Sequence, residues 1–291
     1  MADPTGLEQD PIARRRVLRE LIAYFALAFL ITFGLGAAVI FFRPQFEAVF
    51  GPLGPLGASW PYYVGVCAPT ISAILLSAVF GGLDGLKGLF AGLFRRFQLR
   101  WVFVALLAFP AGLAVWGLVE RFVFGNGATP SINIHAILVT APFLLFTTAA
   151  IFVDPGPWGE ETGWRGYALP RLLTLFSPLK AAIILGVIWA AWHTPAFLVS
   201  GLSQSNYNFG WFLVGVTCIS VLMTWIYVNA NRNFFVAGFI PHEINNRFFG
   251  FAVTDVKIQA LVMIAIVAFI IVVSGPGLKG WWFARTTPAR A

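Results

Sequence analysis

The sequence predicts an all-α protein that crosses a membrane several times, and its composition carries this prediction. Only 11% of the 291 residues are charged and 59% are hydrophobic, whereas soluble domains are about 25% charged. The mean hydropathy is +0.82. A soluble globule of this length has too little interior to cover so much apolar surface. The composition therefore indicates an integral membrane protein, and it excludes a disordered chain and a disulfide scaffold.

Eight apolar segments are each long enough to cross a bilayer as a helix, which takes about 20 residues. The seventh segment is the least apolar of them. The expected spans are residues 20–42, 61–80, 101–124, 135–153, 179–199, 209–229, 233–250 and 256–274.

The basic residues divide unequally between the two sides of this arrangement. Fifteen of the 19 Lys and Arg residues fall on the side of the two termini, and the exceptions are Arg43, Arg121, Arg247 and Lys257. Cytoplasmic loops of membrane proteins carry an excess of Lys and Arg, so we expect both termini in the cytoplasm. This excess accounts for the basic composition, and no nucleic-acid partner is expected.

Residues 83–97 predict a helix of a different kind. Leu and Phe recur there at helical spacing, while Lys87, Arg95 and Arg96 supply positive charge. An apolar face combined with basic residues is typical of a short amphipathic helix in the membrane interface. The alternative is an ordinary basic loop.

The first of three polar clusters contains Glu160, Glu161 and Arg165. An ionisable residue at the bilayer centre costs roughly 2.5 kcal/mol or more, so such residues are paired or face a wet cavity. The run 154–157, Asp-Pro-Gly-Pro, is expected to end one helix and start another at Trp158. Glu161 and Arg165 then share a face and can pair, which leaves Glu160 free. The alternative is two acids stabilised by a helix N-terminus.

The other two clusters contain histidines. His193 lies at the end of an apolar segment, where a packing role is the alternative to a chemical one. His242 and Asn246 are four residues apart and share a helix face, and Glu243 and Arg247 share the adjacent face. A zinc motif of the HExxH type is absent, because Asn246 stands where the second histidine would be.

The deep polar groups together indicate hydrolysis of an amide or ester inside the membrane. A carboxylate beside a neutral imidazole in a desolvated site is suited to activating water. A histidine beside an asparagine can donate hydrogen bonds to a developing oxyanion. The three clusters meet only if residues 158–175 run inside the protein, or if the fifth helix starts below the membrane.

The motifs resemble those of a known family. The chain is similar, in motif order and spacing, to the CAAX prenyl protease and bacteriocin-processing family (CPBP, also called ABI) of intramembrane proteases. The resemblance covers about residues 135–250, which we take as a catalytic core between an N-terminal part, 1–134, and a last span with its tail, 251–291. Three motifs match: Glu160-Glu161-x-x-x-Arg165 (EExxxR), Trp189-x-x-x-His193 (FxxxH, with Trp for Phe) and His242-x-x-x-Asn246 (HxxxN).

The resemblance also implies roles for the motif residues. Glu160 would activate water with the help of His193. His242 and Asn246 would form the oxyanion site, supported by Glu161 and Arg165. We favour a metal-free mechanism because no single helix has metal-binding spacing; if the enzyme used Zn²⁺, its ligands would be Glu160, His193 and His242.

The expected partners are membrane lipid and a peptide or prenylated-protein substrate, and nothing in the sequence indicates an oligomeric state. We expect a multi-pass protein of a prokaryotic cell membrane, with an active site that opens to the cytoplasm. Two other functional classes are alternatives. A proton-coupled transporter predicts related halves with matching interrupted helices, which the sequence lacks. A non-catalytic immunity or scaffold protein need not keep every motif residue, and this chain has them all.

Overall fold

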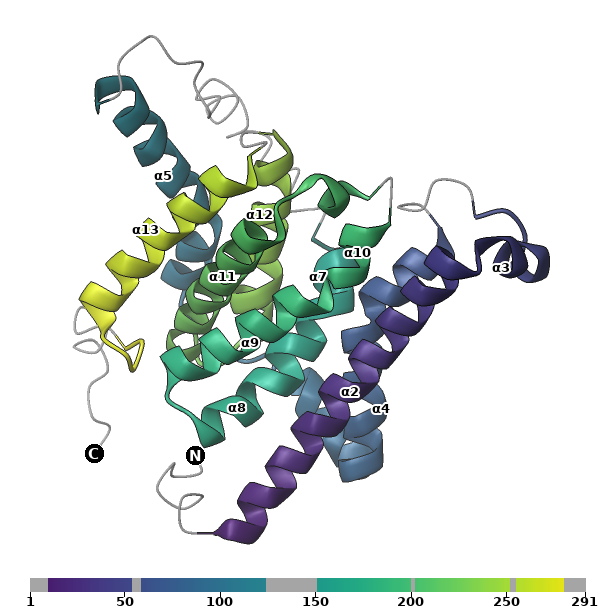
Figure 1. Ribbon diagram of the computed structural model, residues 1–291. Coiled ribbons are helices and arrows are strands. Elements are labelled where there is room, and N and C mark those ends of the chain that lie inside the picture. The colour runs from purple at the N-terminus through teal and green to yellow at the C-terminus, as the bar shows by residue number, and fades with distance from the viewer. Residues whose placement is uncertain (1–9, 54–58, 124–150, 200–201, 252–254, 280–291) are drawn as a thin grey trace.

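A computed structural model describes residues 10–53, 59–123, 151–199, 202–251 and 255–279. These residues form helices and no strand (Figure 1), so the all-α fold class is confirmed. Six helical segments are long and apolar enough to cross a membrane, which confirms a polytopic membrane protein. They are α2 (Pro11–Phe41), α4 (Trp60–Ala91), α5 (Leu99–Val123), α9 (Pro178–Trp192) with α10 (Thr194–Leu198), α11 (Phe209–Asn229) and α13 (Val256–Ser274).

Two of the eight expected spans are not among these six. The span expected at 135–153 lies almost wholly outside the described residues. The span expected at 233–250 is helical, as a π-helix η4 (Phe235–Phe239) followed by α12 (Ile240–Phe251). This segment is short and carries Glu243 and Arg247, which lowers its hydropathy. The number of crossings therefore stays a prediction.

The amphipathic helix expected at 83–97 forms only in part. Helix α4 bends at Gly82, whose φ of 58° and ψ of −145° suit a residue without a side chain. The helix then continues as far as Ala91, and residues 95–98 have no regular structure. The expectation was wrong beyond Ala91, because the carbonyl groups of the following turn bond instead to the side chain of Asn233. The location of this amphipathic helix at a membrane surface stays a prediction.

The helices form two groups with a buried segment between them (Figure 1). Helices α2 and α4 pack together on one side, and α9, α11, α13 and α5 pack on the other, where α12 contacts α5. Between them run α7 (Pro155–Glu161), the π-helix η2 (Thr162–Ala168) and α8 (Leu169–Leu175). Because Trp164, Tyr167 and Leu169 are fully buried, residues 155–175 run inside the protein, which is the first of the two arrangements that let the clusters meet.

The start of this buried segment follows from its sequence. The side chain of Asp154 accepts a hydrogen bond of 2.8 Å from the backbone N–H of Gly156, and Pro155 takes the first helical position, where its missing N–H costs nothing. The helix thus begins at Pro155 and not at Trp158 as expected. A Cβ on Gly159 would lie 2.8 Å from the carbonyl oxygen of Val66, so glycine there lets α7 approach the backbone of α4.

The first and last described helices meet the same end of the bundle. Glu20, near the start of α2, forms an ion pair of 2.9 Å with Arg171 of α8. Just after α13, the carbonyl of Pro276 accepts a hydrogen bond of 3.2 Å from the backbone N–H of Leu179 at the start of α9. Termini on one side of the membrane agree with this arrangement, and their cytoplasmic location stays a prediction.

Candidate active site

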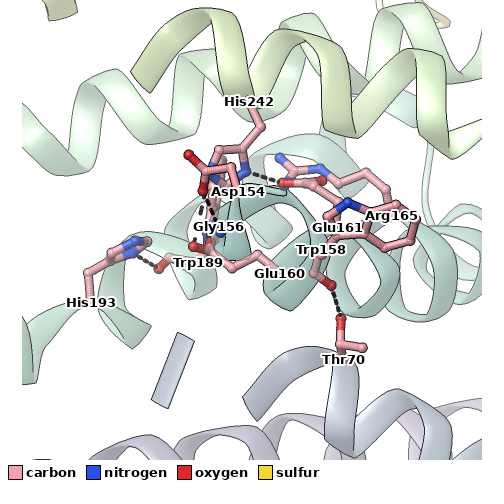
Figure 2. Close-up of polar contacts among 10 residues, drawn as sticks. All are labelled: Thr70, Asp154, Gly156, Trp158, Glu160, Glu161, Arg165, Trp189, His193 and His242. Atoms are coloured by element: carbon pink, nitrogen blue, oxygen red, sulfur yellow. Dashed lines mark hydrogen bonds and ion pairs between the residues drawn. The ribbon is translucent and has the colours of Figure 1, made fainter. Parts of the chain in front are cut away.

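Glu160 and Glu161 are adjacent at the end of α7, yet they have different partners (Figure 2). Oε1 of Glu161 accepts a hydrogen bond of 2.9 Å from Nη1 of Arg165, and both side chains are fully buried. This is the ion pair that the spacing of four residues predicted. The same oxygen lies 2.7 Å from Nδ1 of His242. Because an ionised carboxylate only accepts hydrogen bonds, Nδ1 of His242 donates to Glu161.

Glu160 is buried without a Lys or Arg partner in the described part of the chain. Its Oε2 accepts a hydrogen bond of 2.6 Å from Nε1 of Trp189, and its Oε1 lies 3.9 Å from Nε2 of His242. Glu160 is outside the six apolar spans. Burial raises the pKa of Glu160 to about 7, against the opposing effects of His242 and of the Trp189 N–H. This carboxyl group can therefore gain and lose a proton near neutral pH.

Trp189 links the motifs. In the sequence it stands out only as the tryptophan that replaces phenylalanine in the second motif, and it was not predicted as a site residue. Its indole N–H bonds to Glu160, and its backbone oxygen lies 2.8 Å from Nδ1 of His193. The guanidinium of Arg165 lies 4.2 Å from the centre of the Trp189 ring system, a distance typical of a cation–π contact. Its position could have indicated this role, because Trp189 lies four residues before His193 on the same helix face and has an N–H that phenylalanine lacks.

His193 lies apart from the other motif residues (Figure 2), at the residue that follows α9. Because a carbonyl oxygen only accepts, Nδ1 of His193 donates to Trp189, and Nε2 is the acceptor of the neutral ring. The imidazole also packs edge-on against Trp192 and Phe212, with centroid distances of 4.8 and 5.1 Å. His193 and Glu160 line the same cavity.

His242 and Asn246 lie one turn apart in α12, as expected from their spacing. His242 is buried and Asn246 is exposed. A Cβ on Gly156 would lie 3.5 Å from Nε2 of His242 and 3.6 Å from Nδ2 of Asn246. Both nitrogen atoms therefore border the same small space beside the start of α7.

The cavity that contains Glu160 and His193 has a volume of about 120 Å³. Apolar residues of α2, the start of α4 and α10 form most of its wall. On α2 the lining residues run from Thr32 to Val39, in the part of the helix farthest from its arginine-rich start. The cavity thus lies in the half of the bundle away from residue 10. The location of the N-terminus and the side of the membrane to which the cavity opens both stay predictions.

Two comparisons with known proteins agree with this geometry. The family model described as type II CAAX prenyl endopeptidase Rce1-like matches residues 140–248, which include all three motifs. CAAX prenyl protease 2 of Methanococcus maripaludis is 27% identical over 199 residues, which cover 62% of this chain and 68% of that protein. Both matches support the CPBP family that the motifs resemble, and both names indicate a protease. The six apolar helices agree with a protease that is embedded in a membrane.

The zinc alternative stays a prediction. Within the described ranges, no three His, Cys, Asp or Glu side chains gather closely enough to hold one metal ion. Nδ1 of His193 is bonded to the Trp189 carbonyl and Nδ1 of His242 to Glu161, so Nε2 is the nitrogen that each ring leaves for another partner. No step below passes through a metal.

A second ion-pair network fixes α12 against the start of α7. Nε of Arg247 donates a hydrogen bond of 2.6 Å to Glu243, as the spacing of four residues predicted, and Nη2 donates one of 3.1 Å to Asp154. Asp154 was missed as a site residue, although a helix-capping acid before proline is visible in the sequence. Since the same carboxylate caps α7 and pairs with α12, it helps to hold His242 opposite Glu160. Neither π-helix, η2 or η4, was predicted, although such turns are frequent at functional sites.

Proposed function

We propose that the protein is an intramembrane endopeptidase in which Glu160 activates a water molecule. One observation carries this proposal: the buried carboxylate of Glu160 faces Nε2 of His242 at 3.9 Å. That separation is too long for a direct hydrogen bond, and a water molecule beside the two atoms can contact both. A base whose pKa is near 7 is well matched to taking a proton from water at neutral pH.

The proposed reaction follows from the donors and acceptors around Glu160. Glu160 takes a proton from water as the water oxygen bonds to the peptide carbonyl carbon. The resulting oxyanion accepts hydrogen bonds from His242 and Asn246, and Glu160 returns the proton to the leaving amine as the C–N bond breaks. Nε2 of His193, an acceptor in the same cavity, helps to orient the water.

In this scheme His242 works as an imidazolium. Its Nδ1 already donates to Glu161, so Nε2 can donate to an oxyanion only when the ring carries both protons. The carboxylates of Glu160 and Glu161 on either side favour that charged form. Arg165 donates to Glu161 and holds it against His242, which makes Glu161 and Arg165 positioning residues rather than catalytic ones.

We further propose that the substrate is a membrane-associated peptide, including a CAAX-type prenylated one. The name of the archaeal relative supports this class, and the apolar wall of the cavity suits a lipid-modified chain. The side of the membrane on which the cavity opens is open to test. The positive-inside rule assigns the arginine-rich end to the cytoplasm, and the cavity would then face the other side.

The deciding experiment compares wild type with Glu160→Gln, using peptides with and without a prenyl group and mass spectrometry of the products. Glutamine keeps an oxygen that accepts from Trp189 but cannot take a proton. We expect turnover to fall about 10²- to 10⁴-fold, the usual contribution of a general base, while the variant stays folded. Glu47→Gln, at an exposed helix away from the cavity, is the matched control and should keep full activity. Undiminished cleavage by Glu160→Gln would refute the proposal.

A further inference from the structure

A second cavity, of about 240 Å³, lies at the other end of the bundle from Glu160. Three arginines from three separate segments line it: Arg95 after α4, Arg171 in α8 and Arg232 after α11. Ser77 and Tyr227 add hydroxyl groups to the lining, and no Asp or Glu side chain lines it. The motifs and the proposed reaction leave this cavity without a role.

Hydrogen bonds fix the two turns that carry Arg95 and Arg232 against each other. The buried side-chain amide of Asn233 donates to the carbonyl oxygens of Leu93 at 3.0 Å and Arg95 at 2.6 Å. Asn231 and Arg232 have φ of 54° and 58°, values that residues other than glycine rarely adopt. Strained backbone of this kind persists where the surrounding structure holds it, and it gathers at ligand sites. The fold therefore fixes the backbone from which both arginines reach the cavity.

The charges in the cavity are not balanced. Arg171 pairs with Glu20 at 2.9 Å and lies over the ring of Tyr167. Arg95 and Arg232 have no ion-pair partner within the ranges that the structure describes. Guanidinium groups that line one cavity repel each other, and a bound anion would replace that repulsion with attraction.

We propose that this cavity binds a phosphate group. A guanidinium presents paired N–H donors that match phosphate oxygens, and donors from three segments suit a tetrahedral anion better than a planar carboxylate. The hydroxyls of Ser77 and Tyr227 supply further donors. The cavity lies where α4 and α11 end, and basic pockets between membrane helices near the bilayer surface bind lipid head groups. The phosphate belongs either to an anionic phospholipid or to a free phosphate ion.

The test measures binding without reference to proteolysis. The full chain, purified in detergent, is titrated with inorganic phosphate, with short-chain phosphatidylglycerol and with potassium chloride at matched ionic strength. Thermal unfolding reports stabilisation, and native mass spectrometry counts bound phospholipid. The variants are Arg95→Gln and Arg232→Gln, made singly so that each fold can be checked. Arg96→Gln is the matched control, because Arg96 is adjacent to Arg95 and equally exposed but does not line the cavity. Arg171 is left intact because its ion pair joins α8 to α2.

We expect a ligand-dependent rise in Tm that chloride does not give, with the apparent affinity at least about tenfold weaker in Arg95→Gln and Arg232→Gln than in Arg96→Gln. Stabilisation by the lipid alone assigns the site to a phospholipid head group, and stabilisation by inorganic phosphate assigns it to the free ion. Two results overturn the proposal: neither ligand stabilises the wild type more than chloride does, or Arg96→Gln weakens binding as much as Arg95→Gln. If one arginine variant fails to fold, the other and the wild-type comparison with chloride still decide the outcome.

Discussion

The indole N–H of Trp189 donates a hydrogen bond of 2.6 Å to Oε2 of Glu160, and both groups are buried. The bond favours the ionised carboxylate, whereas burial opposes ionisation, and the pKa of Glu160 stands at about 7. A general base works in its deprotonated form. Because the scheme also needs His242 protonated, we expect kcat/KM of the wild type to rise with pH up to about 7 and to fall again at higher pH, as His242 loses its proton. A pH–rate profile measured on one peptide tests this, and a rate that is constant from about pH 5.5 to 8.5 would contradict the role of Glu160.

Replacing Trp189 with phenylalanine removes the N–H and keeps an aromatic ring. The ionised form of Glu160 then loses a donor, so its pKa rises further and the acidic limb of the profile moves to higher pH. A hydrogen bond to a charged group is worth about 1.5–3 kcal/mol, so we expect a shift of about one pH unit or more. Trp60→Phe, at an exposed tryptophan, is the control and should leave the limb in place. A limb that stays in place, or moves to lower pH, in Trp189→Phe would show that this bond does not tune Glu160.

Ion pairs within one helix were predictable, because the spacing of four residues alone places the two side chains together. The pairs of Glu161 with Arg165 and of Glu243 with Arg247 were both expected and are both present. The bond between Trp189 and Glu160 joins residues 29 positions apart, and no local periodicity can indicate it. Six of the eight spans expected from composition are likewise present in the described residues, since the bilayer dictates their length and hydropathy.

The departures from expectation arise where tertiary contacts override local pattern. The π-helix η4 packs close to Glu161, since a Cβ on Gly238 would lie 2.7 Å from Oε2 of that carboxylate. Such an approach depends on the whole bundle. The helix expected to reach residue 97 ends at Ala91 for a similar reason, because Asn233, distant in the chain, takes the carbonyl groups of Leu93 and Arg95. The assignment of Lys and Arg residues to the two sides of the membrane also counted Arg165 among the residues on the side of the termini, whereas Arg165 is fully buried beside Glu161.

Removing one charge of the buried pair of Glu161 and Arg165 should destabilise the protein more than removing both charges. Arg165→Met leaves the Glu161 carboxylate buried without its cation, which costs about 3–5 kcal/mol. The double variant Glu161→Gln/Arg165→Met removes both charges, so we expect it to be more stable than Arg165→Met. Urea unfolding in detergent measures both.

An exposed ion pair provides the control for this comparison of single and double variants. Arg43 and Glu47 have the same spacing and a distance of 3.0 Å, with side chains 44% and 29% exposed. Removing both should change the free energy of unfolding by less than about 1 kcal/mol. A double variant at Glu161 and Arg165 that is no more stable than Arg165→Met would show that the pair is not coupled.

The space beside Gly156 offers a test of the oxyanion site. Gly156→Ala would place a methyl group 3.5 Å from Nε2 of His242 and 3.6 Å from Nδ2 of Asn246. A substrate oxygen that binds between these nitrogens would be displaced, and losing an oxyanion donor costs about 10²-fold or more in kcat. We expect that loss in a peptide-cleavage assay, with little change in Tm because alanine suits a helix better than glycine.

Gly210→Ala is the matched control for this variant. Gly210 follows its capping residue Asn208 by two positions, as Gly156 follows Asp154, and an added Cβ meets the cap oxygen at 3.2 Å compared with 3.1 Å. Gly210→Ala should keep full activity. Equal activity in the two variants would indicate that the oxyanion binds elsewhere.

The orientation of the cavity can be measured by cysteine labelling. After Cys67 and Cys218 are replaced by alanine, one single cysteine is introduced at Ser203, an exposed residue between Leu202 and Gln204, which line the cavity that contains Glu160. The other is introduced at Lys180, an exposed residue at the start of α9, at the opposite end of the bundle. The positive-inside rule predicts that Lys180 faces the cytoplasm. An impermeant thiol reagent should therefore label Ser203→Cys in intact cells, and Lys180→Cys only after the membrane is opened. The reverse pattern would place the cavity on the cytoplasmic side, and the prediction of a cytoplasmic N-terminus would then be wrong, because the start of α2 and the cavity lie at opposite ends of the same bundle.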